Sequence, residues 1–323
     1  MSEAGGSVTA VSVIEARELT KTYGDFTAVD AISFDVAPGE SFGLLGPNGA
    51  GKSTTMRMIG GTSLRTAGTL SVLGLDPERH GPEVRASLGV VPQADALDEE
   101  LRARDNLYVY GRYFGLPRAY LKAKVPELLE FAQLTDKSDA KVTALSGGMK
   151  RRLTIARGLI NEPRILLLDE PTTGLDPQAR HILWDRLFRL KEQGVTLVLT
   201  THFMDEAEQL CDRLVVVDHG RIVAEGSPRG LIQEHTTREV VEVRFGSARN
   251  AEMQAELAAL VADGQRSRAG LEVLPDRILL YTDDGEAMLE EINRRALNPL
   301  TQLVRRTSLE DVFLRLTGRS LID

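Results

Sequence analysis

A glycine-rich run that ends in a lysine and a serine is the part of the sequence best suited to chemistry. It follows the apolar stretch 41–45, precedes a helical pattern and reads Gly46-Pro47-Asn48-Gly49-Ala50-Gly51-Lys52-Ser53. Glycines let successive backbone N–H groups face one anion, and the positive end of the helix dipole adds to the attraction. In such a loop Lys52 reaches the β- and γ-phosphates and Ser53 ligates Mg²⁺. The run therefore predicts a binding site for ATP or GTP.

Two adjacent acids form a second candidate site. Asp169 and Glu170 follow the continuous apolar run 165–168. Such a run predicts a buried strand of a parallel sheet, and ligands of α/β proteins bind at the carboxyl edge of that sheet. We therefore expect both carboxylates to lie at the nucleotide site.

A further anion-binding pattern occurs between the two motifs. Ser146, Gly147 and Gly148 place a hydroxyl and two glycines before a predicted helix at 149–160, and helix N-termini attract phosphate. The sequence has one phosphate loop and one acidic strand end, so this second cradle has no lysine or metal ligands of its own. The simplest arrangement is a composite site, in which the cradle closes over a nucleotide held by another copy of the chain.

The elements around these motifs predict an α/β fold. Residues 11–19 and 28–36 alternate between apolar and polar types, which indicates antiparallel strands. From residue 41 onward strand and helix patterns alternate, which is typical of an α/β core. The stretch 105–134 is helical, and we expect a helical subdomain over about 95–160. The other expected core strands are 69–73, 88–91, 165–169, 196–200 and 214–217, and the helices are 54–59, 149–160 and 178–192.

The length of 323 residues suits about two domains. After Thr237 the elements follow the order strand, helix, strand, strand, helix, strand, with a final helix at 309–316. This order predicts a small α+β domain of the ferredoxin-like type. Ser227, before Pro228, is a candidate helix cap. We place a nucleotide-binding domain at 1–235 and an accessory domain at 236–323.

Composition limits the partners and the location. The net charge of -8 argues against a nucleic-acid partner, because such proteins present a basic face. The run Lys150-Arg151-Arg152 is therefore interpreted as a solvated helix face. No apolar stretch approaches the ~18 residues of a membrane span, and the N-terminus lacks the features of a signal peptide, so we expect a cytosolic protein. The single Cys211 excludes an internal disulfide and is expected to pack in a helix.

Taken in order, the motifs resemble those of a known family. The phosphate loop, Leu145-Ser146-Gly147-Gly148, the acidic strand end, Gly174-Leu175-Asp176 and His202 resemble the ATP-binding subunit of an ABC transporter. The resemblance covers residues from about 11 to 233. The motif sequences are similar to those of the ATPases of drug and nodulation-factor exporters, whose membrane subunits are separate proteins. Residues 309–313 add to this similarity.

The resemblance implies a P-loop NTPase core with an antiparallel β subdomain and a helical subdomain, and it implies roles for three catalytic residues. Glu170 would orient and deprotonate the attacking water, as a general base does. His202 would hydrogen-bond the γ-phosphate. Gln93, which follows the apolar strand 88–91, would contact Mg²⁺ and the attacking water and sense the membrane subunit.

The resemblance also implies the binding residues. Mg²⁺ would be held by Ser53, Gln93 and Asp169, with Asp169 acting through water. Tyr23 would stack on adenine, Asp176 would lie at the dimer seam, and the second cradle would meet the opposite γ-phosphate. The residues expected to contact ATP are Tyr23, Gly46, Pro47, Asn48, Gly49, Ala50, Gly51, Lys52, Ser53, Thr54, Ser146, Gly147, Gly148 and Asp176.

By this resemblance the chain is a peripheral ATPase at the cytoplasmic face of the cell membrane. Two copies would close around two ATP molecules and drive the export of a lipid, glycan or drug-like amphiphile through integral membrane subunits. A DNA-maintenance ATPase would need long coiled coils between residues 53 and 145, where no sustained heptads occur, and a translation factor usually has two such heads. The accessory domain could brace the dimer, regulate hydrolysis or bind cargo.

Overall fold

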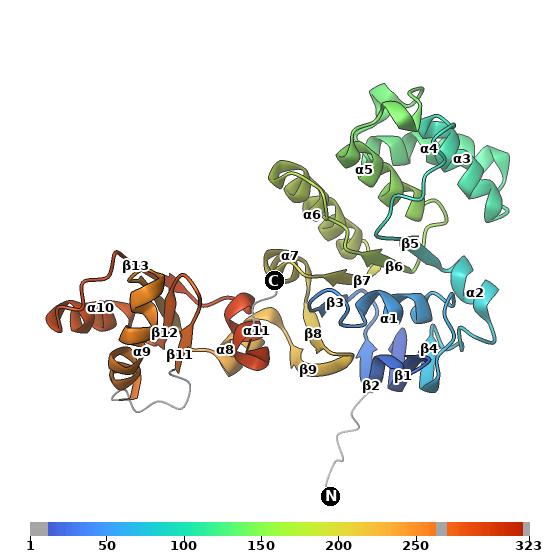
Figure 1. Ribbon diagram of the computed structural model, residues 1–323. Coiled ribbons are helices and arrows are strands. Elements are labelled where there is room, and N and C mark those ends of the chain that lie inside the picture. The colour runs from blue at the N-terminus through green and yellow to red at the C-terminus, as the bar shows by residue number, and fades with distance from the viewer. Residues whose placement is uncertain (1–11, 263–269, 319–323) are drawn as a thin grey trace, which may run out of the picture. The chain divides into compact units, whose positions relative to one another are not determined.

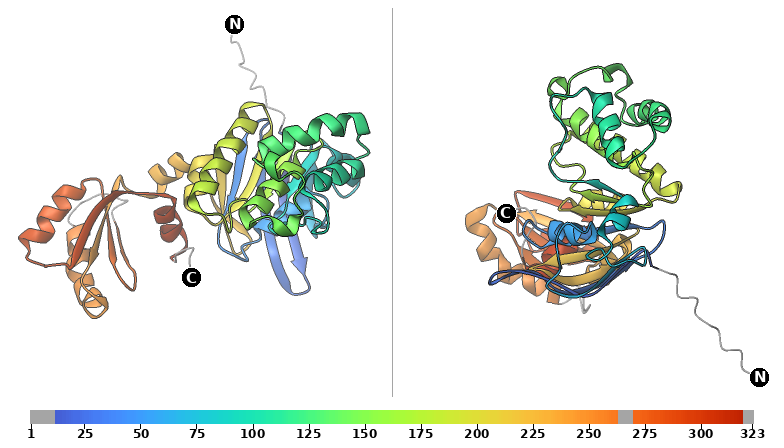
Figure 2. Two further views of the ribbon diagram at one scale, coloured as in Figure 1. Left: turned by 90° about the horizontal axis from the view of Figure 1, so that it is seen from above. Right: turned by 90° about the vertical axis from the view of Figure 1, so that its right-hand side faces the viewer.

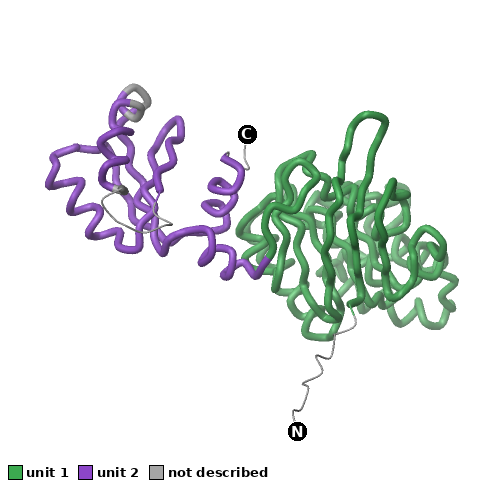
Figure 3. The backbone as a smooth tube through the Cα atoms, turned by 90° about the horizontal axis from the view of Figure 1, so that it is seen from below, with its two compact units in different colours: residues 1–225 green, residues 226–323 purple. Residues whose placement is uncertain are grey.

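The computed structural model describes residues 12–262 and 270–318. The chain divides into two compact units, 1–225 and 226–323 (Figure 3). The sequence placed this division at 235/236. Helix α8 (Pro228–His235) belongs to the second unit because it packs against α11 (Leu309–Thr317). As predicted, Ser227 caps α8, and its hydroxyl accepts a hydrogen bond of 3.0 Å from the Gly230 amide.

A six-stranded sheet forms the centre of the first unit (Figure 1). Its strands β3, β5, β6, β7 and β8 run parallel where they pair. Apart from Val90 on β5, their apolar residues are buried, as is typical of parallel strands covered on both faces. Cys211 is buried beside β3, as expected of a packing residue. In sheet order the strands are β5 (Leu88–Val91), β6 (Ile165–Asp169), β7 (Thr196–Thr201), β3 (Ser41–Leu45), β8 (Arg213–Asp218) and β9 (Arg221–Gly226).

An antiparallel sheet of three strands shares its core with the central sheet. Its order is β2-β1-β4, and one cluster of buried side chains joins it to α1 (Lys52–Ile59) and the parallel strands. Phe34 on β2 stacks on Phe42 of β3 with ring centroids 5.4 Å apart, a contact worth about 0.5–1.5 kcal/mol beyond its buried area. The strands are β1 (Ile14–Tyr23), β2 (Phe26–Val36) and β4 (Ala67–Val72).

The helical subdomain inserts between β5 and β6. Its helices α3 (Ala103–Tyr113), α4 (Arg118–Phe131) and α5 (Gly147–Gly158) pack on one another (Figures 1 and 2). Pro117 precedes α4, where a fixed backbone φ suits the helix start. The strand and helix that follow, β6 and α6 (Pro177–Glu192), return to the core. The elements that were not predicted include α2 (Gly81–Ala86) and β9. Helix α7 (Met204–Leu210) ends one residue before Cys211, which the sequence analysis placed in a helix.

The second unit has the predicted ferredoxin-like arrangement. Its elements are β10 (Glu239–Arg244), α9 (Ser247–Ala262), β11 (Gly270–Val273), β12 (Ile278–Thr282), α10 (Gly285–Arg294) and β13 (Thr301–Arg306), followed by α11. The sheet order is β11-β12-β10-β13 and each pairing is antiparallel. Apolar residues that alternate along β10 and β12, such as Val241 and Leu280, form its core with Leu257.

Candidate functional site

The phosphate loop joins β3 to α1, and its shape depends on glycine. Gly49 and Gly51 have φ values of 82° and 99°, in the left-handed region that favours glycine. A Cβ added to Gly46 would lie 2.1 Å from the Val217 carbonyl oxygen, and one added to Gly51 would lie 2.3 Å from the Ala28 oxygen. These positions therefore admit no side chain, and the loop backbone curls as the sequence predicted.

Lys52 is held beneath this loop. Its ammonium donates hydrogen bonds of 2.7 Å to the Gly46 carbonyl and 2.9 Å to the Pro47 carbonyl. The side chain is buried, which lowers the pKa of the ammonium, while Glu170 and Asp169 act in the opposite direction. A cation is thus fixed next to the loop amides, where it can pair with phosphate oxygens.

Asp169 ends β6 and gathers hydroxyl groups from two other elements. The Ser53 hydroxyl at the start of α1 donates to its Oδ1 at 3.0 Å, and the Thr200 hydroxyl on β7 donates to the same oxygen. Magnesium prefers oxygen ligands and is usually held by one or two carboxylates together with phosphates and water. The pair formed by Ser53 and Asp169 fits this preference. Within 12–262 and 270–318, no group of three or more His, Cys, Asp or Glu residues could hold a metal ion.

Glu170 lies one residue further, and three side chains converge on its carboxylate. Gln93 and Thr173 donate to its Oε2 at 3.0 and 3.1 Å, and His202 Nδ1 lies 3.2 Å from its Oε1. Glu170 is buried, with a left-handed φ of 48°. Such a conformation costs about 1–3 kcal/mol in a non-glycine residue and is concentrated at functional sites. The tertiary structure therefore unites Gln93, Glu170 and His202, which are far apart in the sequence.

Tyr23 stands at the end of β1, beside the first turn of α1, with 48% of its surface exposed. Its hydroxyl interacts with Ser63 and Thr54, and these hydrogen bonds, together with the charges of Lys21 and Arg57, lower its pKa. The Lys21 ammonium also lies 4.8 Å from the ring centroid. An exposed aromatic ring next to the phosphate loop suits stacking on a base.

The second cradle is positioned by the start of α5. Ser146 is exposed and caps the helix, its hydroxyl accepting from the Met149 amide at 3.3 Å. A Cβ on Gly147 would meet nothing within 4 Å, while one on Gly148 would lie 3.5 Å from Leu175 Cδ2. The hydrogen bonds described above for the phosphate loop and the acids include none with this cradle. Ser146 and Gly147 are exposed, so the start of α5 is accessible to another molecule.

Asp176 is exposed at the start of α6. Its Oδ1 accepts a hydrogen bond of 2.9 Å from the Ala179 amide, so the side chain caps the helix. This local role accounts for an aspartate at the position within a single chain. Any further role at a dimer seam has to come from a second copy.

The interpretation of Lys150-Arg151-Arg152 as a solvated face is wrong for Arg151. This side chain is 3% exposed, and its guanidinium donates to backbone carbonyls beside Gln93 and Glu170. Helical geometry explains the error, because successive residues point about 100° apart and only one of three adjacent cations faces the core. Thr173 and Thr200 were also missed, because threonine is common in strands and turns and carries no motif of its own.

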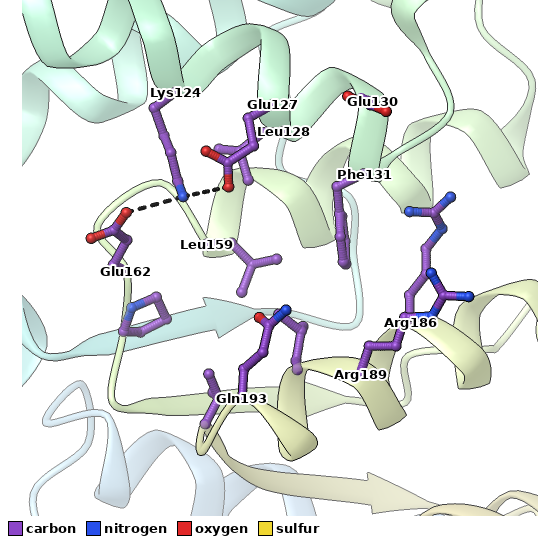
Figure 4. A pocket seen from close by; sticks show the side chains of 13 residues that line it. Lys124, Glu127, Leu128, Glu130, Phe131, Leu159, Glu162, Arg186, Arg189 and Gln193 are labelled. Carbon is purple, nitrogen blue, oxygen red and sulfur yellow. Dashed lines mark hydrogen bonds and ion pairs between the residues drawn. The ribbon is translucent and has the colours of Figure 1, made fainter.

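A separate cleft of about 600 Å³ lies between α4 and α6 (Figure 4). At one end Lys124 pairs with Glu127 at 2.7 Å and with Glu162 at 3.0 Å. At the other end Arg186 and Arg189 lie beside Phe131. The lining contains equal numbers of acidic and basic residues and none of the predicted nucleotide-site residues. The cleft is thus distinct from the nucleotide site and has no net charge preference.

Comparison with known proteins identifies the family of the chain. Residues 29–173 match the family model for ABC transporters, and residues 255–318 match that of the nodulation factor export protein NodI, C-terminal domain. Nod factor export ATP-binding proteins I from Paraburkholderia xenovorans and Rhizobium sp. are each 50% identical to the chain. The first alignment covers 97% of this chain and 99% of the relative, and the second covers 95% and 98%.

Solved structures give the same result for the first unit. An ATP-binding subunit of an ABC transporter has a TM-score of 0.64 and 30% identity, covering 69% of this chain and 93% of that chain. A dimeric ATP-binding cassette in a post-hydrolysis state, bound to ADP and Pi, has a TM-score of 0.62 and 27% identity, covering 66% and 98%.

The parallel sheet, the phosphate loop and the converging acids define a P-loop nucleotide-hydrolysing protein. The chain belongs to the family of ATP-binding subunits of ABC transporters, and it binds and hydrolyses ATP. The family resemblance and the fold predicted from the sequence are thereby confirmed. Cassettes of this family form dimers and pair with membrane subunits.

Proposed function

We propose that this chain powers export through separately encoded membrane subunits, and that its cargo is a Nod factor or a chemically similar amphiphile. The support is similarity to Nod factor export ATP-binding proteins over nearly the whole chain. The second unit contributes to this support, because residues 255–318 match the C-terminal domain of the NodI family. A nucleic-acid partner is not part of the proposal, since the net charge is -8.

Two copies of the chain enclose two ATP molecules in this proposal. Each copy contributes its phosphate loop to one site and the exposed cradle at Ser146 and Gly147 to the other. The exposed start of α5 and the dimeric cassette among the similar structures support this arrangement. Asp176 lies at the seam between the copies, and the accessory domain, residues 236–323, braces the dimer.

In the nucleotide site, Tyr23 stacks on adenine and the loop residues 46–54 surround the phosphates. The loop amides and Lys52 hold the β- and γ-phosphates, because fixed N–H groups and a buried cation bind anions strongly in a water-poor site. Ser53, Asp169 and Gln93 hold Mg²⁺, which neutralises phosphate charge when bound. These roles place positive charge where it builds up in phosphoryl transfer.

Glu170 acts as the base. Its carboxylate accepts a proton from the attacking water while Gln93 orients that water, a contribution of typically ~10²–10⁴ in rate. His202, 3.2 Å from Glu170, donates to the γ-phosphate and links it to the base. The single observation that carries this assignment is the convergence of Gln93, Thr173 and His202 on one buried carboxylate.

The proposed location is the cytoplasmic face of the cell membrane, bound to the membrane subunits. Over residues 12–262 and 270–318, no helix combines the length and the apolar composition that crossing a bilayer requires. Attachment therefore depends on protein partners in this proposal. The partner is tested by gentle solubilisation of the membrane, after which the same integral membrane protein should be recovered with the chain. The cargo is tested by adding a Nod factor, which should stimulate ATPase activity.

The central experiment replaces Glu170 with Gln. The variant should keep its affinity for ATP, because Lys52 and the loop are untouched, but hydrolysis should slow by about 10²-fold or more. ATP should then hold two copies together, and gel filtration with ATP and Mg²⁺ should show a stable dimer. Glu162→Gln is the matched control, since Glu162 pairs with Lys124 at the separate cleft. Normal turnover and a monomer for Glu170→Gln would reject the role of this residue.

A further inference from the structure

Arg151 occupies an unusual place between the two halves of the nucleotide machinery. It lies on α5, five residues after Ser146, the residue that caps this helix, and its side chain is 3% exposed. The guanidinium contacts the backbone just after β5 and β6, where it donates to the carbonyls of Gln93 and Glu170. One side chain therefore connects the helix of the cradle with two groups at the nucleotide site.

All three nitrogens of the guanidinium are used. Nε donates to the Pro171 carbonyl at 2.9 Å, and Nη2 donates to the Asp169 and Glu170 carbonyls at 2.9 and 3.0 Å. On the other side, Nη1 donates to the Pro92 carbonyl at 2.6 Å and the Gln93 carbonyl at 3.3 Å, and to Asp95 Oδ1 at 3.4 Å. The contacts divide into two sets, one on each loop.

The geometry of these contacts matters because their acceptors include the backbone carbonyls of Gln93, Asp169 and Glu170. The Gln93 amide donates to the Glu170 carboxylate at 3.0 Å, so the separation of the two loops sets this bond. Arginine has a rigid planar fork with five N–H donors, whereas a lysine ammonium is a single point on a flexible stem. The carbonyl arrangement is thus matched to a guanidinium and poorly matched to an ammonium.

We propose that Arg151 is a positioning residue for ATP hydrolysis, which holds the Gln93 loop and the Asp169-Glu170 strand end at the separation that catalysis needs. Because the same side chain fixes the start of α5, it also sets the orientation of the cradle that serves the second nucleotide. The inference rests on the roles proposed for Gln93 and Glu170.

Arg157 provides a matched control on the same helix. It is also buried, at 8% exposure. Its guanidinium donates to the Ala96 carbonyl and lies 4.7 Å from the ring of Tyr110. It therefore anchors the same segment three residues beyond Gln93 without the bonds to Asp169 and Glu170. A merely structural role of a buried arginine on α5 predicts the same effect for both positions.

The experiment compares Arg151→Gln, Arg151→Lys and Arg157→Gln in the full chain, each checked for folding by circular dichroism. Arg151→Gln should lower kcat by about 10- to 100-fold, because small misplacements of reacting groups have effects of this size. Its Kd for ATP should stay within about twofold, since Lys52 and the loop amides are intact. Arg151→Lys should recover only part of kcat, and folded Arg157→Gln should keep a near-normal kcat.

Hydrogen exchange gives a second measurement that does not depend on turnover. In Arg151→Gln, exchange should rise in both 92–95 and 169–173, whereas Arg157→Gln should affect only the first segment. Equal kcat for Arg151→Gln and Arg157→Gln, or full recovery by lysine, would overturn the inference. If Arg151→Gln does not fold, the lysine variant decides the matter by the same comparison.

Glu170→Gln, measured in parallel, separates this inference from the proposed function. Full activity of Glu170→Gln would refute the proposed base, whatever the arginine variants do. An inactive Glu170→Gln combined with a normal Arg151→Gln would refute the positioning role alone.

Discussion

Replacing Glu206 with Gln should make the protein more stable at alkaline pH. Glu206 lies on α7 and is fully buried. Burial raises the pKa of its carboxyl to about 7. Interactions with the Thr201, Thr172 and Trp184 side chains lower this pKa but have a smaller effect. Neither carboxyl oxygen completes a hydrogen bond of normal geometry within the described residues, which explains why burial prevails. The folded protein therefore favours the protonated carboxyl, which a glutamine amide resembles in shape.

The sign and size follow from linkage between proton binding and folding. Between the ordinary pKa of 4.5 and the folded value of about 7, the folded state holds more protons than the unfolded state, so stability falls as pH rises. The full shift corresponds to about 3 kcal/mol, at ~1.36 kcal/mol for each pKa unit. Between about pH 5.5 and about pH 8.5 the natural chain should lose about 2 kcal/mol of this contribution to its free energy of unfolding.

Urea unfolding of both proteins at these two pH values measures the effect. The free energy of unfolding of Glu206→Gln, relative to the natural chain, should increase by about 2 kcal/mol from the lower to the higher pH. Glu192→Gln is the control, because Glu192 is exposed on α6 and should show no such trend. A difference between Glu206→Gln and the natural chain that is the same at both pH values would refute the reasoning.

Three further substitutions test other parts of the molecule. Gly51→Ala should weaken ATP binding and lower the melting temperature, because its Cβ would lie 2.3 Å from the Ala28 oxygen; unchanged affinity in calorimetry would contradict this. Ser53→Ala should raise the Mg²⁺ concentration for half-maximal hydrolysis by about tenfold, and a titration with a constant midpoint would speak against metal binding there. Asp311→Ala should destabilise the second unit by about 3 kcal/mol, because Arg305 loses hydrogen bonds of 2.7 and 3.0 Å to the Asp311 carboxylate. An unaltered midpoint of urea unfolding would show that this ion pair does not stabilise the unit.

The sequence was most informative where a residue type is tied to a backbone conformation. Gly51 and Gly49 require left-handed φ values, so the phosphate loop is visible in the order of residues alone. The acidic strand end was predicted at 165–169, which are the bounds of β6, because a continuous apolar run has few alternatives in an α/β chain. The strand and helix order of the second unit was sufficient for its ferredoxin-like topology.

The sequence was least informative where burial decides the role of a polar residue. Arg151 is one of three adjacent cations, and Glu206 is one of several acids after His202. Their periodicity does not mark them as buried, because charged residues are rarely buried without partners. The partners of Arg151 are carbonyls from residues 92–93 and 169–171, and contacts with backbone atoms leave no trace in side-chain patterns.

The sequence by itself determined the chemical groups, the order of the elements and the family, since phosphate binding demands particular residues at fixed local spacing. Only the tertiary structure decided that Gln93 and His202 meet at Glu170 and that Arg151 connects the Gln93 loop with the Asp169-Glu170 strand end. The physical reason is that these contacts join parallel strands that are distant along the chain but adjacent in the sheet. Their distances and burial arise when the core packs, and no local pattern encodes them.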